Sequence, residues 1–162
     1  MPFTPFHLGP GLAIGMLFKK HINIASILLA SIIIDIRAIY CLFFSNCPLH
    51  GPLHTFVGAT VSAMFVIAGI YMFRRQLGKI SDFFKIHQDY SLKSITAGAL
   101  IGVWLHILLD AFLYSDMFPL WPNLTNPFLG MFSNSIIYNF CVLCFLIGGV
   151  LYLHKIAKNK NI

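Results

Sequence analysis

The stretch SITAGALIGVWLHILLDAFLY, residues 94–114, decides the fold, because it is apolar enough and long enough to cross a bilayer as one helix. Its only histidine is His106 and its only acidic residue is Asp110. Side chains four residues apart lie on the same face of a helix. The stretch therefore predicts a transmembrane helix that presents an imidazole and a carboxylate together inside the membrane.

The rest of the chain follows the same pattern. Its 162 residues are 58% hydrophobic and only 10% charged, whereas about a quarter of the residues of a soluble protein are charged. We predict an all-α, integral membrane helical bundle that forms a single domain over residues 1–162. Four to five transmembrane segments are expected, at about residues 7–18, 22–44, 54–73, 94–114 and 136–153.

The first of these segments differs from the others in length. A helix over residues 7–18 would reach only about 18 Å, against about 30 Å for the hydrocarbon core, so it is a marginal span or a re-entrant piece. Residues 74–93 mix basic and aromatic side chains and could form an amphipathic helix at the interface.

The basic residues indicate the orientation. Of the 11 Lys and Arg, all except Arg37 lie after the first, third or fifth segment, and the connections at 45–53 and 115–134 contain none. The positive-inside rule predicts a multi-pass protein of the cell membrane with a cytoplasmic C-terminus and with these two connections outside. The net charge of +6 is therefore a topology signal. Membrane lipid is the expected partner, and no nucleic acid is.

Histidines and aspartates converge on one level of this predicted bundle. Asp35, His106 and Asp110 come about 20, 18 and 24 Å along their outward-running segments. Two histidines four residues apart, which one face of a helix would project, mark the outer end of the segment 54–73, and another begins the first segment. Imidazole and carboxylate groups are ligands for zinc or a similar divalent ion. The predicted metal ligands are His7, Asp35, His50, His54, His106 and Asp110.

Each of these residues also has a simpler interpretation. Asp35 could form a salt bridge with Arg37, although side chains two residues apart point to different faces of a helix. His106 and Asp110 could hydrogen bond to lock one helical turn. His50 could be a loop residue and His7 a helix-entry residue at the interface.

Four short motifs, in this order, resemble those of the membrane-bound metal-dependent hydrolase family, the group that includes the LexA-regulated inner-membrane proteins. The resemblance runs from Met1 to about Pro127 and implies a multi-helix membrane protein with a His/Asp metal site. The motifs are Thr4-Pro5-Phe6-His7-x-x-x-Gly11, the span with Asp35, His50-Gly-x-x-His54-Thr55 and Trp104-Leu-His106-x-x-x-Asp110.

One position departs from the family pattern. Members commonly carry Asp-x-Glu-Pro in the second span, where this chain has Asp35-Ile36-Arg37-Ala38. The cation in place of the second carboxylate indicates a lost metal position, a single-metal site, or an arginine that holds an anionic substrate group such as a phosphate. Asp35 and Arg37 are therefore the candidate catalytic residues.

The leading hypothesis is a divalent-metal hydrolase at the outer leaflet, with zinc as the preferred ion, although manganese and iron suit the same ligands. The substrate would be an ester or phosphodiester, including one in a lipid. A bound metal lowers the pKa of a water molecule and polarises a phosphoryl or acyl oxygen, and a free Asp or His would act as base.

Two other readings remain open at this point. The first is a non-enzymatic metal- or proton-handling protein, which would need ionisable residues at successive depths across the membrane. The inner halves of the segments 22–44 and 94–114 show only apolar and small residues, which favours a one-sided site. The second is a structural polar cluster that locks helix packing.

Overall fold

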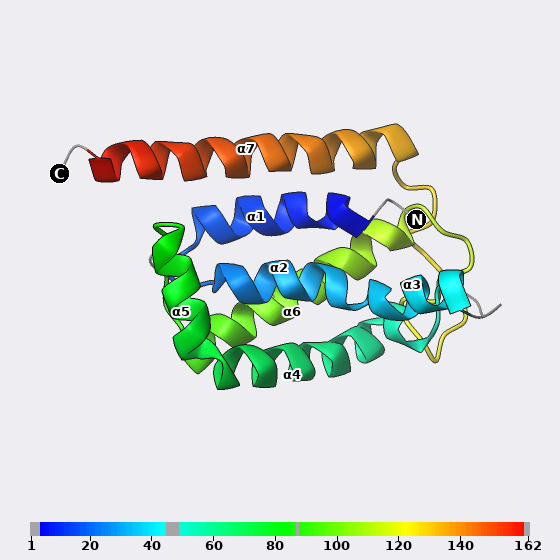
Figure 1. The fold of residues 1–162 in the computed structure, drawn as a ribbon. Coiled ribbons are helices and arrows are strands. Elements are labelled where there is room, and N and C mark those ends of the chain that lie inside the picture. The colour runs from blue at the N-terminus through cyan, green and yellow to red at the C-terminus, as the bar shows by residue number, and fades with distance from the viewer. Residues whose placement is uncertain (1–3, 45–48, 87, 161–162) are drawn as a thin grey trace.

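The computed structural model describes residues 4–44, 49–86 and 88–160. Over these ranges it contains helices and no strand, which confirms the predicted all-α bundle (Figure 1). In chain order the elements are η1 (Thr4–His7), α1 (Leu8–Leu17), α2 (Ile24–Ile33), α3 (Asp35–Phe44), η2 (Pro52–His54), α4 (Phe56–Met72), α5 (Arg74–Phe83), α6 (Leu92–Ala111) and α7 (Asn134–Lys160). The remaining residues of the predicted domain, 1–3, 45–48, 87 and 161–162, lie outside the described residues.

Within the described residues, three helices are long and apolar enough to cross a membrane. They are α2 with α3 (Ile24–Phe44), α6, and α7 as far as Lys158; α4 with α5 adds a fourth if this bent pair counts as one span. The predicted segment 7–18 forms only the ten-residue α1 and is not among these candidates. The prediction that this segment is shorter than a full membrane span agrees with the length of α1.

The predicted segment 22–44 is broken at Ile34, where α2 ends and α3 begins. Asp35 is the first residue of α3 and is completely buried. Of the predicted amphipathic helix over residues 74–93, the structure contains only α5, Arg74–Phe83, which bends away from α4 by 76°. The break in the span and the bend after α4 both lie within runs that contain neither proline nor glycine.

Two glycines allow α6 to lie directly against α2. A Cβ atom at Gly102 would come within 2.6 Å of the Ile27 carbonyl oxygen and 2.7 Å of Ala30 Cβ, and one at Gly98 would come within 2.7 Å of the Asn23 carbonyl oxygen. Small residues at such a spacing let two helices approach closely in a membrane. His106 follows Gly102 by one more step of four, so the same contact row leads to the candidate site.

The outermost helix of the bundle is α7, which runs beside α1 (Figure 1). A Cβ atom at Gly148 would lie 2.7 Å from Leu12 Cγ, so α1 is held between α7 and α2. Figure 1 places the start of α1, the end of α6 and the start of α4 at one end of the bundle, and α5 at the other. The ends of these three helices therefore meet where the predicted ligands lie.

Candidate metal centre

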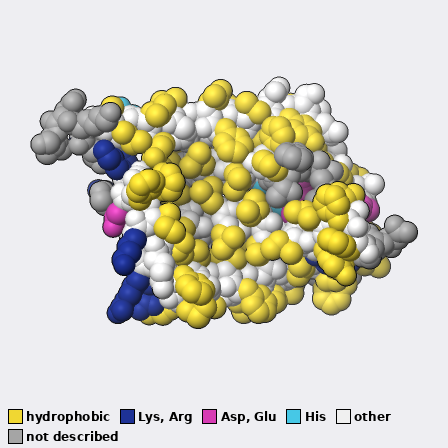
Figure 2. All heavy atoms as spheres, in the orientation of Figure 1, with side chains coloured by type: hydrophobic (Ala, Val, Ile, Leu, Met, Phe, Trp, Pro, Cys, Tyr) yellow, Lys and Arg dark blue, Asp and Glu magenta, His cyan; other side chains and the backbone are white. Residues whose placement is uncertain are grey.

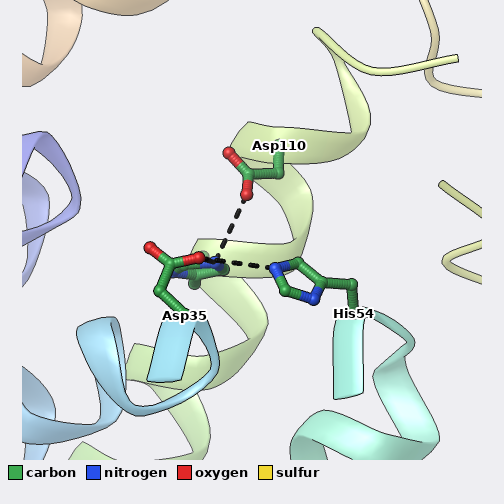
Figure 3. A group of neighbouring side chains, drawn as sticks. Asp35, His54 and Asp110 are labelled. Atoms are coloured by element: carbon green, nitrogen blue, oxygen red, sulfur yellow. Dashed lines mark hydrogen bonds and ion pairs between the residues drawn. The ribbon is translucent and has the colours of Figure 1, made fainter. Parts of the chain in front are cut away.

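Four of the predicted ligands form one buried group that could hold a metal ion. One donor atom from each of Asp35, His54, His106 and Asp110 lies within 4.8 Å of each of the others. All four side chains are 0–1% exposed. Asp35, His54 and Asp110 point toward one another from three separate segments of the chain (Figure 3).

The distances inside this group are short and consistently involve imidazole Nε2 atoms. His106 Nε2 lies 3.3 Å from Asp110 Oδ2 and 3.5 Å from Asp35 Oδ1. His54 Nε2 lies 3.4 Å from the same Asp35 oxygen. The predicted pairing of His106 with Asp110 on one helix face is confirmed.

The break between α2 and α3 orients His106. The last four carbonyl groups of a helix have no partner inside it, and the Ser31 carbonyl is one of these in α2. His106 Nδ1 lies 2.8 Å from the Ser31 carbonyl oxygen, so it carries the proton and donates this hydrogen bond. Nε2 therefore faces both carboxylates with its lone pair unless a second proton is bound. A hydrogen bond from one ring nitrogen to a backbone carbonyl is the usual support of a metal-binding histidine.

His7 extends the group from the side of α1. Its Nε2 lies 3.2 Å from Asp110 Oδ1, its ring stacks on His106 with centroids 4.0 Å apart, and it is 2% exposed. It stands at the join of η1 and α1. The structure thus brings His7 to the centre, next to the four residues that form the candidate metal group.

The buried atoms that face this centre fit a cation. Among the described residues, His7 Nε2, His106 Nε2 and Asp110 Oδ1 are buried and make no hydrogen bond of good geometry. A neutral imidazole lone pair that faces a carboxylate is repelled unless a cation lies between them. Two carboxylates and neutral imidazoles would together balance one divalent ion.

His50 occupies a different place from the other predicted ligands. Its Nδ1 lies 2.9 Å from both carboxylate oxygens of Asp116, and its ring meets that of His54 edge to face with centroids 5.0 Å apart. His50 Nε2 is buried and makes no hydrogen bond to the described residues. His50 is therefore a neighbour of the four-residue group, held by a carboxylate of its own.

The expectation that His50 and His54 project from one face of a helix is wrong. His50 lies in a bend, and the short helix η2 covers only Pro52–His54. Gly51 is extended (φ −123°, ψ −159°) and Pro52 follows it, and a proline disfavours helical geometry in the residue before it. The two imidazoles approach one another through this turn instead.

Arg37 reaches the same turn. A methyl group placed at Gly51 would overlap the Arg37 guanidinium, so the cation lies directly against this part of the backbone. Arg37 is half-buried. The Arg37 side chain thus packs against Gly51, which lies between His50 and His54 in the sequence, at the edge of the site.

A largely apolar cavity of about 440 Å³ opens beside the group. His50 and His54 form its inner wall, and Phe118, Trp121 and Val57 form much of the rest. The hydrogen bond from the Phe56 amide to the Pro119 carbonyl, at 2.9 Å, ties α4 to the loop that covers this cavity. A ligand in the cavity would contact the two imidazoles directly.

Three features of the site were not predicted from the sequence: the Asp116 carboxylate, the Ser31 carbonyl and the cavity. Asp116 is the only acidic residue in the connection 115–134, which lacks Lys and Arg, and that isolation was an available signal. Ser31 acts through its backbone carbonyl, and every residue has such a group, so its role could not be predicted from the residue type.

Comparisons with known proteins add no relative from which a function could be transferred. No family model, no curated protein and no solved structure matches this chain. The function has to be inferred from the buried side chains and from the cavity beside them.

Proposed function

We propose that this protein is a membrane-embedded, metal-dependent hydrolase that cleaves an ester or phosphodiester of a lipid. The carrying observation is the buried set of two carboxylates and inward-facing imidazole nitrogens within 4.8 Å of one another. In the apolar interior of a bundle such a set is stabilised by a compensating cation. We take the ion to be zinc, whose usual ligands are of this kind.

Asp35, His54, His106 and Asp110 would hold the ion, with His7 beside them. A bound divalent ion would supply a water of lowered pKa and would polarise the bond to be cleaved. His50 stands outside this group, lines the cavity, and has a buried Nε2 without a hydrogen bond to the described residues. Because the Asp116 carboxylate accepts a hydrogen bond from Nδ1, Nε2 can accept a proton. This gives His50 the place of the base, while Asp35 becomes a metal ligand.

The proposed membrane orientation puts this site on the outer side. On the face shown in Figure 2, most Lys and Arg side chains gather at the end of the molecule where α5 lies. Cys41, which follows Asp35 toward the other end, is disulfide-bonded. Disulfides persist in oxidising compartments outside the cytoplasm. Both observations support a cytoplasmic C-terminus and a site in the outer half of the bilayer.

A lipid could enter this site sideways from the membrane. Val57 lines the cavity and also lines a shallow groove of about 490 Å³ on the surface of α4 and α6, together with Trp104. Val57 and Trp104 are 56% and 44% exposed. The groove and the cavity share Val57 as a lining residue. We propose that an acyl chain passes from one to the other across Val57 and that Arg37, at the edge of the site, binds an anionic headgroup.

The alternative of a proton or ion conduit has less support. Among the described residues, the histidines and aspartates that are buried as whole residues are all at this site: His7, Asp35, His50, His54, His106 and Asp110. The other buried polar residues, such as Asn23 and Ser26 at the α5 end, bond to backbone groups. No titratable chain therefore continues from the site toward that end within the described part of the protein.

The function is tested with the purified full-length protein in nanodiscs loaded with zinc or manganese. We expect release of a cleavage product from a long-chain lipid phosphodiester or carboxylic ester, measured by mass spectrometry, and loss of the product when a chelator is added. The His106→Ala variant serves as the inactive reference. A metal-loaded protein that cleaves neither class of lipid would contradict the hydrolase proposal and leave metal handling as its function.

A bulky residue at Val57 should block the lipid path. We expect Val57→Trp to lower kcat/KM for a long-chain substrate by about tenfold, since losing contact with two methylenes costs about 1.6 kcal/mol. Cleavage of a short-chain, water-soluble analogue should change by less than about twofold. Leu146→Trp, at a residue of α7 that is 62% exposed, is the control. Equal losses on both substrates would refute lateral entry.

Asp116 should act as a positioning residue for His50. We expect Asp116→Asn to lower kcat/KM by about 10-fold to 100-fold, the effect typical of a partner that orients a histidine. Metal content should stay at the wild-type level, because Asp116 is not part of the four-residue group. A shift in the pH dependence of kcat would separate this role from a purely structural one, which would leave the profile in place.

A further inference from the structure

A second cavity, of about 420 Å³, lies far from the metal centre at the C-terminal ends of α1 and α7. Its lining joins an apolar floor to four basic side chains and includes no carboxylate. The lining residues are Met16, Lys19, Leu151, His154, Lys155 and Lys158. Basic side chains from α7 and from the turn after α1 therefore face one small space.

Lys155 is the unusual member of this group. Its Nζ atom is buried and has no hydrogen-bond partner among the described residues. Lysines at the end of a membrane helix normally extend so that the ammonium reaches water, and burying an ammonium without acceptors is unfavourable. Lys158 lies three residues further along α7, on the same face, which adds positive charge to the same space. The structure holds these cations together without a carboxylate of its own in the cavity lining.

We propose that this cavity binds a phosphate group, supplied either by the headgroup of an anionic phospholipid or by free phosphate. Phosphate oxygens would accept hydrogen bonds from Lys155 and from Lys19 and would compensate their charges. Met16 and Leu151 provide apolar surface for the glycerol end of a lipid. The cavity lies at the end of a candidate membrane span, Asn134–Lys158, where headgroups are found.

The neighbouring Lys20 is an example of a lysine that acts only as a topology signal, and it differs from the lysines of the cavity in its exposure. It follows Lys19 directly, yet it is exposed and does not line the cavity. A cation that only fixes orientation needs no neighbours and can stay in water. The convergence of three lysines and the burial of one ammonium are not required for topology.

The proposal is tested with the full-length protein in zwitterionic detergent. Phosphatidylglycerol and inorganic phosphate are titrated separately, and the rise in Tm and the lipid retained in native mass spectrometry are measured. We expect Lys155→Met to weaken phosphate binding by about tenfold, the loss of one charge-assisted hydrogen bond. Lys20→Met, with the same change in net charge, should bind like the wild type. Without either probe, Lys155→Met should unfold at the same or a higher temperature than the wild type.

The two probes distinguish the two sources of the phosphate group. A response to phosphatidylglycerol alone assigns the site to a lipid headgroup, and a response to inorganic phosphate as well assigns it to the free anion. Lys19→Met offers an independent test and should show the same loss. Equal responses of the wild type, Lys155→Met and Lys19→Met to both probes would overturn the proposal. None of these measurements uses the metal centre.

Discussion

Replacing Asp110 with asparagine will abolish metal retention by the purified protein. The carboxylate lies against His106 on one side and His7 on the other, so asparagine removes a ligand and half of the negative charge that balances a divalent ion. Loss of an outer partner alone costs about 10-fold to 100-fold in metal affinity, and we expect loss of this ligand to exceed about 100-fold. Metal content by mass spectrometry, at matched folding, is the measurement.

Two comparisons make this result specific. Asp116→Asn removes the same charge from a nearby carboxylate outside the four-residue group and should keep the metal. A chelator should lower the Tm of the wild type, because a ligand at 100 times its Kd stabilises by about 2.7 kcal/mol, and it should leave the Tm of Asp110→Asn unchanged. Wild-type metal stoichiometry in Asp110→Asn would show that the cluster holds no ion through this residue.

The second large effect is expected at Gly102, which has no side chain that could bind a metal. A leucine there has to displace α6 from α2, because even a Cβ atom would lie 2.6 Å from the Ile27 carbonyl oxygen. Overpacking of this kind costs about 1–3 kcal/mol or more. It also disturbs the 2.8 Å hydrogen bond between His106 and the Ser31 carbonyl. We therefore expect a lower Tm and a metal affinity reduced by about tenfold or more.

Gly149 provides the matched control for this substitution. Apart from the neighbouring backbone of α7 itself, no atom of the described residues lies within 4 Å of a Cβ atom built at Gly149. Leucine there should therefore leave both the Tm and the metal content near the wild-type values. Thermal unfolding in detergent and metal titration of the two variants measure both effects. If Gly102→Leu and Gly149→Leu behave alike, close packing of α6 on α2 does not support the site.

The sequence predicted the bundle and the core of the site because lipid leaves few alternatives for polar groups. Asp35, His106 and Asp110 each interrupt an apolar run, and an ionisable group in such a run needs a partner at its own depth. The depth estimate of 1.5 Å per residue was sufficient to bring them together with His54. The structure confirms this grouping for the four residues.

Other features had no comparable signal. The break at Ile34 lies in a run of isoleucines that contains neither proline nor glycine, so the free Ser31 carbonyl that orients His106 could not be foreseen. The geometry of His50 depends on a turn through Gly51 and on Asp116 in a distant loop, whereas spacing alone suggested a helix. Helix α7 continues to Lys160, beyond the predicted end at 153, because a helix does not have to stop where its apolar run stops.

The distribution of the centre over the chain has a consequence for biogenesis. Asp35 lies in the candidate membrane span of α2 and α3, and its contact with His106 becomes possible only after α6 has been synthesised. A charged side chain in a span raises the cost of insertion by about 2.5–3.5 kcal/mol. Nascent chains that stop before residue 92 hold Asp35 and His54 but lack His106 and Asp110, so the four-residue group cannot close in them. We therefore expect the bilayer to retain them less firmly than complete chains. The centre that gathers α1, α3, η2 and α6 would thus also act as a checkpoint for completed synthesis.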